Sequence, residues 1–571
     1  MEKKTEKELL QEVENLRAQV EKLKARKKYG LVWDAEKEPE KVVLDCRKKL
    51  PILVEDKKKE IKGKGDEPVN LLIEGDNYHS LSVLNYTHKG KVDVIYIDPP
   101  YNTGARDWKY NNDYVDINDN WRHSKWLSFM EKRLKLARNL LKKDGVLICT
   151  IDKNEVSTLG VLLQELFPER EIVCVTIVHN PGGIQGLNFS HVNEYAYFIH
   201  PRPGTFISKV KKEDAPQRAF RDWGKESSKR TSAKTCFYPI YVKSGEIIGF
   251  GDTCQENFHP KNSNIKREDE MIEVYPLDKN GVERKWRFSR GSVESIKDEL
   301  LPKEIGGEIS IFREKQDYRW KTVWTENEYN ANVYGTKLLN NIISGNFPYP
   351  KSLYAVRDCI KAVIHNKNKA IILDFFAGSG TTGHATMELN KSDKGKRRFI
   401  LCTNNENNNG DGGGIAEDIC YPRIKKIIKG YCGISDKREY KGLGGNLRYY
   451  KTDFVETENL DNATDQDKIE LTYKAGEMIA IKEETFEEVE KDDWWQIFSN
   501  GKEVTAIYFK EDKSKLQKLV EKLDKMDKKV NLYIFSWGKN EYANEFTEYK
   551  KIKVKDIPEP LIEVYKEVAN I

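Results

Sequence analysis

The chain alternates short apolar runs with longer stretches of amphipathic pattern. The amphipathic stretches have helical periodicity and span residues 126–141, 160–167 and 353–366. The apolar runs are rich in β-branched residues, as are strands buried on both faces of a sheet, and they span residues 92–97, 145–151, 171–178, 370–374 and 396–403. Strands and helices that alternate in this way predict an α/β protein built on a doubly wound, mainly parallel sheet.

The residues between these runs give three further local predictions. Gly145 is expected to cap the helix that begins near residue 126. The run from His191 to Ile199 is expected to form an edge strand. Residues 102–121 are rich in Asn, Asp, Trp and Tyr, and this composition suits a loop that closes over a substrate.

Changes in the pattern divide the chain into five segments. The periodicity of apolar residues is irregular between residues 201 and 345, and the sequence pattern changes again after residue 435. We expect an N-terminal amphipathic or coiled-coil helix (1–28), two halves of one sheet domain (29–200 and 346–435), a domain inserted between them (201–345) and a small C-terminal α/β domain (436–571). In the first segment, the apolar residues at heptad spacing are Leu9, Val13, Leu16, Val20 and Leu23. This short heptad pattern fits two alternatives equally well: a dimerisation helix, and a helix that lies on its own domain.

Composition narrows the class of protein. Charged residues make up 33% of the 571 residues, and no apolar run is long enough to span a bilayer. The nine cysteines show no Cys-x-x-Cys pair and no zinc-site spacing. We therefore expect a cytoplasmic protein with reduced thiols and no metal site. A net charge of +5 is small for this length, so a nucleic-acid surface has to come from local basic clusters.

The apolar run 92–97 ends in Asp98-Pro99-Pro100-Tyr101. Because the prolines cannot continue a sheet ladder, an acidic group and an aromatic ring are presented at the carboxyl end of a strand, where α/β sheets bind ligands. The Asp98 carboxylate and the Pro99 carbonyl can each accept one N–H of an exocyclic amine, and Tyr101 can stack on the ring. The motif predicts a site for a flat amino-heterocycle, with an ordinary strand-to-loop exit as the alternative.

A second motif combines a strand, a glycine-rich turn and the start of a helix. Gly378 and Gly380 allow the backbone to pass close to a ligand, and Gly383 allows the helix to pack tightly on the strand. The candidate ligand contacts of this turn are Asp374, Phe375, Phe376, Ala377, Gly378, Ser379, Gly380, Thr381 and Thr382. Nucleotide and flavin enzymes use similar turns, so the glycines alone are a weak signal.

Taken together, Asp98-Pro99-Pro100-Tyr101 and the turn 374–382 resemble the two signature motifs of the S-adenosylmethionine-dependent DNA amino-methyltransferases, in their adenine-N6 form. The catalytic motif precedes the cofactor motif, as in the β class, and the length and N-terminal helix are similar to those of the modification (Mod) subunits of type III restriction-modification systems. The resemblance covers residues 29–435. It implies a Rossmann-like methyltransferase sheet with circularly permuted motif order, a target-recognition domain at 201–345 and S-adenosylmethionine as cofactor.

The resemblance also suggests further cofactor contacts. Asp76 matches a turn at the cofactor's adenine, Lys351 and Ser352 match a segment at its methionine end, and Asp98 is expected to contact it as well. Glu406 follows the strand 396–403, where an acidic residue commonly binds ribose hydroxyls. For Asp76 the alternative is an ordinary acidic turn, and for Lys351 and Ser352 it is a proline-rich lead into a helix.

Basic residues interleaved with aromatic residues mark the inserted segment. Lysine and arginine outnumber aspartate and glutamate ten to four over residues 201–235, and similar clusters recur at 284–290 and 318–321. Such residues neutralise phosphates, reach base edges or stack on bases. The candidate DNA contacts are Arg218, Arg221, Trp223, Arg287, Arg290, Arg319 and Trp320. A solvated charged surface is the alternative for any one cluster.

The resemblance implies a site-specific DNA methyltransferase that transfers a methyl group to N6 of a flipped-out adenine in duplex DNA, without a metal. Cytosine-N4 members of the resembled family usually carry Ser where this chain has Asp98, which favours adenine. The expected partners are double-stranded DNA, a second copy of the chain and, unless the protein is a solitary relative, a restriction subunit with helicase and nuclease activity. The alternatives are cytosine-N4 or RNA methylation, and a catalytically silent subunit that supplies DNA specificity.

Overall fold

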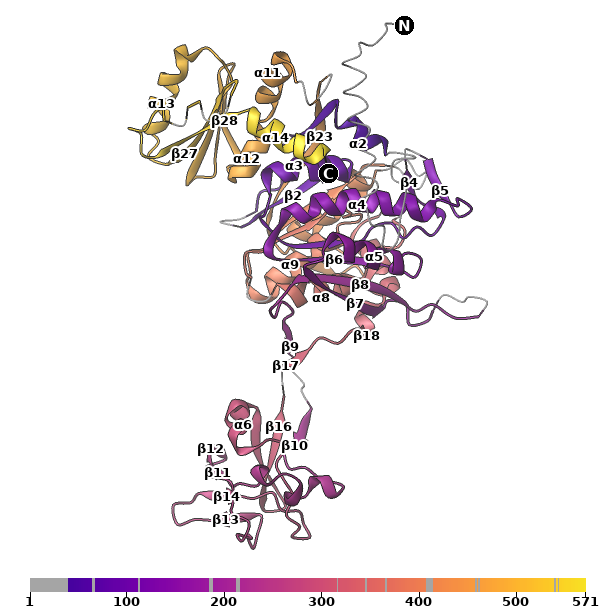
Figure 1. Ribbon diagram of the computed structural model, residues 1–571, viewed down its shortest axis with the longest axis vertical. Helices are drawn as coiled ribbons and strands as arrows, with labels where there is room; N and C mark the ends of the chain where they lie inside the picture. Colours follow the sequence, from indigo (N-terminus) through magenta and orange to yellow (C-terminus); the bar gives the residue numbers. More distant parts are fainter. Residues whose placement is uncertain are drawn as a thin grey trace, which may run out of the picture. The chain divides into compact units, whose positions relative to one another are not determined.

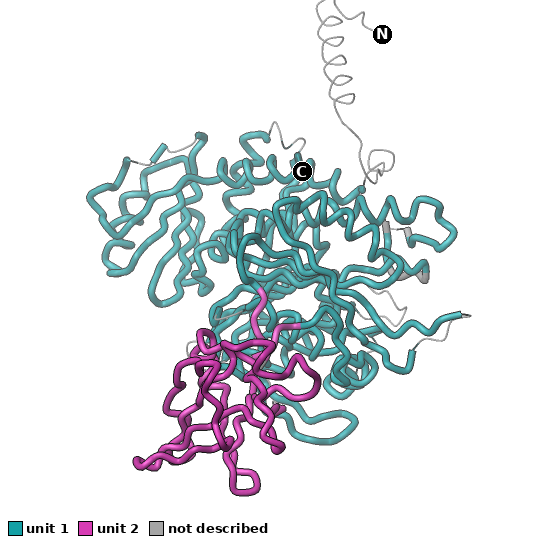
Figure 2. The backbone as a smooth tube through the Cα atoms, turned by 60° about the horizontal axis from the view of Figure 1, so that its bottom comes forward, with its two compact units in different colours: residues 1–206, 321–571 teal, residues 207–320 magenta. Residues whose placement is uncertain are grey.

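The computed structural model describes residues 40–570, apart from residues 64–66, 111–112, 184–187, 212–215, 316, 345–346, 365–366, 407–413, 458–459, 461–462, 539–540 and 543. The predicted helix 1–28 lies outside the described residues. The chain divides into two compact units (Figure 2): the first comprises Met1–Phe206 and Lys321–Ile571, and the second comprises Ile207–Trp320.

A ten-stranded sheet forms the centre of the first unit (Figure 1). Its strands lie in the order β1 (Lys49–Glu55), β23 (Asn446–Glu456), β2 (Val69–Glu74), β20 (Arg398–Thr403), β19 (Ile371–Asp374), β3 (Val92–Ile97), β6 (Leu141–Ile151), β8 (Asn193–Pro201), β7 (Arg170–Val178) and β18 (Val323–Trp324). The six strands from β23 to β6 in this order are parallel to one another, whereas β1 is antiparallel to β23 and β8 is antiparallel to both β6 and β7. The prediction of an α/β protein is confirmed, and the large sheet is mixed.

Both faces of this sheet are buried, and this explains why most residues of its central strands are apolar. Successive residues of β2 belong to different cores: Leu71 and Ile73 pack in one hydrophobic cluster, and Leu72 packs in another. The first cluster includes residues of α3 (Asn77–Thr87), α4 (Arg122–Leu140) and α5 (Val156–Leu166), and the second includes residues of α9 (Thr381–Asp393) and α10 (Tyr421–Lys429). Removal of apolar area from water on both faces is the main stabilising contribution.

Three local predictions were wrong. Gly145 does not cap α4, because the chain enters β6 directly at Leu141; at Gly145 an added Cβ would lie 2.9 Å from the Val92 carbonyl oxygen, so the glycine permits close approach to β3. The strand at 191–199 is not at the edge, because β8 lies between β6 and β7. Within the expected loop 102–121, β4 (Ala105–Tyr110) pairs with β5 (Asp113–Asp116) as a hairpin.

The C-terminal part of the chain contributes to both a second sheet and the first core. The second sheet contains β24 (Glu487–Lys491), β25 (Trp495–Ser499), β26 (Glu503–Tyr508), β27 (Lys529–Phe535) and β28 (Ile552–Ile557). In contrast, β23 lies in the large sheet, although it falls within the range expected for the C-terminal domain. The helix α14 (Glu559–Ala569) packs on α3, and the Tyr565 hydroxyl donates to the Pro51 carbonyl.

The second unit is built from short strands around an aromatic core. Its sheets are formed by β10 (Gln217–Ala219), β16 (Glu308–Glu314) and β15 (Leu300–Ile305), by β12 (Glu246–Phe250), β11 (Ile240–Lys243), β14 (Ile272–Val274) and β13 (Asn264–Lys266), and by β17 (Asp317–Arg319) and β9 (Lys209–Lys211). Phe220 and Trp286 stack in its core with ring centroids 5.4 Å apart. Across both units, none of the described helices is long and apolar enough to cross a membrane.

Candidate active site

The carboxyl ends of β3 and β19 meet at one edge of the large sheet. The two strands are parallel neighbours, with Val94 opposite Ile372 and Ile95 opposite Leu373. Asp98 directly follows β3, and the glycine-rich turn directly follows β19. Folding therefore brings the two sequence motifs to the same edge, where open α/β sheets bind their ligands.

Three polar side chains contact the Asp98 carboxylate, and a fourth, Glu194, contacts two of these. Asp98 Oδ1 accepts hydrogen bonds from the hydroxyls of Thr150 (2.7 Å) and Tyr101 (2.9 Å), and Lys351 Nζ lies 3.3 Å from it. Lys351 forms a second salt bridge with Glu194 and donates to the Tyr101 hydroxyl. The Tyr101 hydroxyl also lies 3.1 Å from Glu194 Oε2. We call these five residues (Asp98, Tyr101, Thr150, Glu194 and Lys351) the Asp98 cluster.

Burial and charge act in opposite directions on this cluster. Burial raises the pKa of Asp98, and the adjacent Lys351 ammonium opposes that rise. Burial acts to raise the pKa of Glu194 too, but Lys351 and His179 outweigh it and the net shift is downward. Burial acts to lower the pKa of Lys351, but the carboxylates of Asp98 and Glu194 raise it overall. The cluster therefore keeps Lys351 protonated and Glu194 ionised.

Further contacts hold the Tyr101 ring and the prolines of the Asp98-Pro99-Pro100-Tyr101 motif. Lys351 Nζ lies 4.4 Å from the centroid of the Tyr101 ring, within cation–π range. Pro99 is buried, and the Pro100 carbonyl accepts a hydrogen bond from the Trp126 indole N–H at 2.7 Å. Trp126 belongs to α4, so this helix fixes the path of the motif after β3.

Sequence reasoning missed two members of the Asp98 cluster. Thr150 lies near the end of β6, and Glu194 lies near the start of β8. Neither belongs to a motif; the antiparallel pairing of β6 with β8, which places Thr150 opposite Ala196, brings them together. The one available signal was Glu194, an ionisable side chain next to the mainly apolar and aromatic run 195–199.

The glycine-rich turn is shaped by its own polar side chains. Gly378 (φ 48°) and Gly380 (φ 78°) adopt left-handed conformations that other residues rarely reach. The Asp374 carboxylate accepts hydrogen bonds from the Phe376 N–H (2.9 Å) and the Thr382 hydroxyl (2.5 Å). Burial raises the pKa of Asp374 to about 7. Asp374 and Thr382 thus hold the turn in place, and the predicted residues Phe375 and Ala377 are buried.

Arg423 is a further residue that sequence reasoning did not assign to the site. This buried side chain from α10 donates to the hydroxyls of Ser379 (3.0 Å) and Thr381 (2.8 Å). Burial lowers its pKa to about 10. Arg423 therefore clamps the predicted contacts Ser379 and Thr381 from the side of the turn that faces α10.

The segment 347–352 connects the glycine-rich turn with the Asp98 cluster. A Cβ added at Gly378 would lie 3.1 Å from the Phe347 ring, so this ring covers the turn. Lys351 enters the Asp98 cluster, and the Ser352 hydroxyl caps α8 (Leu353–Val363) by accepting from the Ala355 N–H. Ser352 also donates to the Glu328 carbonyl at 2.6 Å, so it anchors the segment.

Asp76 and Glu406 lie at the same edge of the sheet. Asp76 caps α3 by accepting from the Tyr78 N–H at 2.7 Å, and the preceding Gly75 N–H donates to the Thr403 carbonyl at the end of β20. Glu406 pairs with Lys109 of the β4–β5 hairpin at 3.2 Å. Both carboxylates are partly exposed, so both can receive a ligand.

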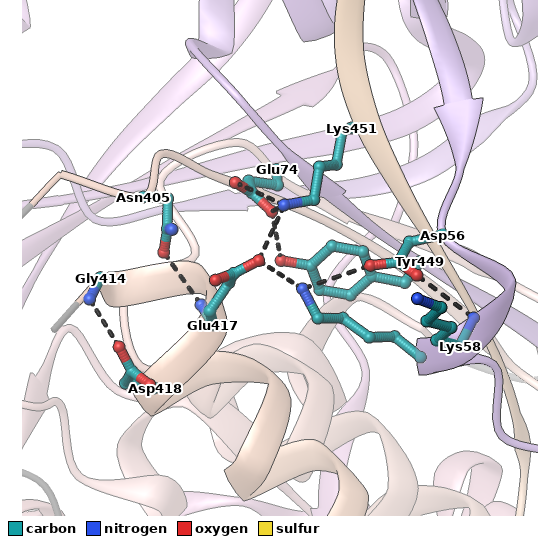
Figure 3. Close-up of polar contacts among 10 residues, drawn as sticks. Asp56, Lys58, Glu74, Asn405, Gly414, Glu417, Asp418, Tyr449 and Lys451 are labelled. Atoms are coloured by element: carbon teal, nitrogen blue, oxygen red, sulfur yellow. Dashed lines mark hydrogen bonds and ion pairs between the residues drawn. The ribbon is translucent and has the colours of Figure 1, made fainter.

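An ion-pair cluster fastens the segment that follows β20 (Figure 3). Glu417 lies between Lys59 and Lys451, at 2.7 Å from the latter, and Lys451 also pairs with Glu74 at 3.0 Å. The Glu417 N–H donates to the Asn405 side chain at 3.0 Å. Hydrogen bonds from the two lysines lower the pKa of Glu417 to about 2. These contacts tie the chain after β20 to β2 and β23.

The predicted DNA contacts of the second unit fall into two groups. Trp223 is 72% exposed, and Arg218, Arg287 and Arg319 are also exposed. The other three have structural contacts or are half-buried: Arg221 donates to the Leu277 carbonyl, Arg290 donates to the carbonyls of Gly251 and Phe250, and Trp320 is half-buried. The first group is therefore the one available to a polyanion.

Comparison with known proteins agrees with this site. Residues 92–441 match the family described as DNA methylase (N6_N4_Mtase). The EcoPI Mod subunit of a type III restriction-modification enzyme, from Escherichia phage P1, is 28% identical over 404 residues, covering 62% of this chain and 60% of that protein. The StyLTI Mod subunit from Salmonella typhimurium is 29% identical over 396 residues, covering 62% of this chain and 55% of that protein.

The type II methyltransferase M.KpnI from Klebsiella pneumoniae is 28% identical over 351 residues, covering 58% of this chain and 79% of that protein. The matched region thus spans little more than half the length of these two Mod subunits. The family match covers more than half of this chain and includes both Asp98-Pro99-Pro100-Tyr101 and the glycine-rich turn. The chain therefore belongs to the N6/N4 DNA methylase family, distantly related to type III Mod subunits.

Proposed function

We propose that this protein transfers a methyl group from S-adenosylmethionine to N6 of an adenine in duplex DNA. The observation that supports this proposal is the position of Asp98: its carboxylate follows β3, and the neighbouring parallel strand β19 leads into the glycine-rich turn. A carboxylate that accepts an amine N–H therefore lies beside a turn suited to a nucleoside-containing cofactor.

S-adenosylmethionine is the methyl donor of this family, and when bound it supplies an electrophilic methyl group on a sulfonium. The residues at this edge of the sheet fit such a ligand. The left-handed glycines Gly378 and Gly380 leave the backbone of the turn open to close approach. The partly exposed Asp76 and Glu406, after neighbouring strands β2 and β20, are placed to bind its adenosine moiety.

The chain's own residues would orient the target base. Asp98 accepts one N–H of the exocyclic amine, and this directs the nitrogen lone pair away from the ring. The Tyr101 ring stacks on the adenine, while Thr150 and Lys351 fix the Asp98 carboxylate. Catalysis by such a site consists mainly of orienting the amine toward the methyl group.

The target base must leave the duplex, because N6 is not reachable inside the stack. We propose that the second unit, Ile207–Trp320, acts as the target-recognition domain and binds DNA through Arg218, Trp223, Arg287 and Arg319. Relatives named as Mod subunits support a role in a type III restriction-modification system, with a restriction subunit as partner.

Nucleoside analysis tests the proposal. The protein is incubated with duplex DNA and S-adenosylmethionine carrying a deuterated methyl group, and the DNA is digested to nucleosides for mass spectrometry. Deuterated N6-methyl-2′-deoxyadenosine is expected with the wild-type protein and not with Asp98→Ala, which should still bind DNA. Labelled N4-methyl-2′-deoxycytidine would overturn the choice of adenine. Label in RNA offered in a parallel incubation, with none in the DNA, would overturn the choice of DNA.

A further inference from the structure

We infer that Glu194 sets the charge of the methyl-transfer site: by pairing with Lys351, it leaves the Asp98 cluster with one net negative charge, which favours a sulfonium over an uncharged thioether. This inference rests on the proposed function and extends it to a positioning residue that touches neither substrate nor cofactor. It assigns to the site a preference for the cofactor, S-adenosylmethionine, over its product, S-adenosylhomocysteine.

Glu194 is the most deeply buried charge of the cluster. Its side chain is 4% exposed, compared with 13% for Lys351 and 24% for Asp98. A carboxylate buried to this extent in a strand is costly unless a cation pairs with it. Lys351 supplies that cation, and the short contact between Lys351 Nζ and Glu194 Oε2 makes this the tighter of the two lysine pairs.

The charges of the cluster do not cancel. With both carboxylates ionised, Asp98 and Glu194 contribute two negative charges, and Lys351, which opposes the effect of burial on the pKa of Asp98, contributes one positive charge. His179 is the neighbouring titratable group near Glu194; burial lowers its pKa, so it adds no positive charge at neutral pH. Asp152, close enough to Lys351 to be influenced by its charge, can only add negative charge. Without Glu194, Lys351 would neutralise Asp98 and the cluster would carry no net charge.

The net charge matters because the cofactor and its product differ by one charge. The sulfonium of S-adenosylmethionine is positive, whereas the thioether left after methyl transfer is neutral. The Asp98 cluster lies at the same sheet edge as the glycine-rich turn, and Asp98 is close enough to act on the titration of Asp374 at the end of β19. A net negative cluster at this position attracts the sulfonium and has no such attraction for the thioether.

Calorimetric titration of the full-length protein with each of the two ligands tests this inference. In Glu194→Gln, the affinity for S-adenosylmethionine relative to S-adenosylhomocysteine should fall roughly ten-fold, the order expected when one nearby unit charge is lost at an effective dielectric constant of about 20. In Lys351→Met, which leaves two negative charges, the same ratio should rise by a comparable factor. The opposite signs separate a charge effect from a general loss of structure.

Glu417→Gln is the matched control, since it removes a carboxylate that also pairs with a lysine but belongs to the ion-pair cluster after β20. Its ratio should stay within about two-fold of the wild-type ratio. Unchanged ratios in both cluster variants would overturn the inference alone, and if Glu194→Gln does not fold, the direction of change in Lys351→Met decides. A wild-type protein that binds neither ligand would overturn the proposed function, and the inference with it.

Discussion

At the scale of single residues, the Tyr101 hydroxyl has more contacts than a purely stacking role requires. It lies within hydrogen-bond distance of Asp98 and Glu194 and accepts from Lys351. We expect Tyr101→Phe, which keeps the ring, to lower the single-turnover methylation rate roughly ten-fold, as loss of one charge-assisted hydrogen bond would. Tyr101→Ala should lower it much further, because stacking is lost as well.

Tyr197→Phe is a suitable control for this comparison, because the Tyr197 hydroxyl donates to the Val156 carbonyl and lies outside the Asp98 cluster. It should leave the single-turnover rate close to the wild-type value. Equal losses in Tyr101→Phe and Tyr101→Ala would show that the hydroxyl, and not the ring, carries the effect.

Asp374 should make the stability of the protein depend on pH. Burial raises its pKa from 3.8 to about 7, so the folded state binds this proton more tightly than the unfolded state does. Its contribution to the free energy of unfolding therefore falls as pH rises from about 4 to about 7, by up to roughly 4 kcal/mol. Thermal unfolding of Asp374→Asn and wild type from pH 5 to pH 8 measures this, and the difference in Tm should shift in favour of the variant as pH rises. Parallel pH profiles would contradict the prediction.

At the scale of elements, the helical turn η7 (Asn332–Lys337) limits where Lys351 can lie. Gly335 is buried, and a Cβ added there would lie 2.2 Å from the Pro350 carbonyl oxygen. Because that atom belongs to the backbone, Gly335→Ala must displace the segment that carries Lys351. We expect it to destabilise the protein by about 1–3 kcal/mol, a typical cost of overpacking, and to lower the methylation rate.

Gly291→Ala is the control for this prediction, since a Cβ at Gly291 would meet no atom within 4 Å. Thermal unfolding and methylation should be unchanged in this variant. If Gly335→Ala also behaved like the wild type, the position of Lys351 would not depend on contact with η7.

The elements show where sequence reasoning succeeds and where it stops. The strands 92–97 and 145–151 were predictable because most residues of a strand covered on both faces are apolar. The central position of β8 in the sheet was not predictable, since the burial of its residues alternates as in a strand with one solvated face. Glu194 and Thr150 were missed for a related reason: strand pairing across the sheet brings them to Asp98, and no local pattern encodes that pairing.

At the scale of the whole molecule, different substitutions in the second unit should change DNA affinity and thermal stability separately. Arg319→Ala removes an exposed charge, so it should weaken DNA binding and reduce the slope of log affinity against log salt by about one. Arg290→Ala removes a side chain that donates to the carbonyls of Gly251 and Phe250, so it should lower the Tm instead. Fluorescence anisotropy at several salt concentrations, together with thermal unfolding, measures both effects; an unchanged slope in Arg319→Ala would argue against a phosphate contact.

The order of strands in the large sheet also has a consequence during synthesis. β2 ends at Glu74, but its two neighbours begin only at Arg398 and Asn446. While the ribosome makes the intervening chain, both hydrogen-bonding edges of this strand have no native neighbour, and such edges are sites of aggregation. A nascent chain of this protein therefore exposes these edges until β23 has emerged, and binding of a chaperone during that interval should reduce its aggregation.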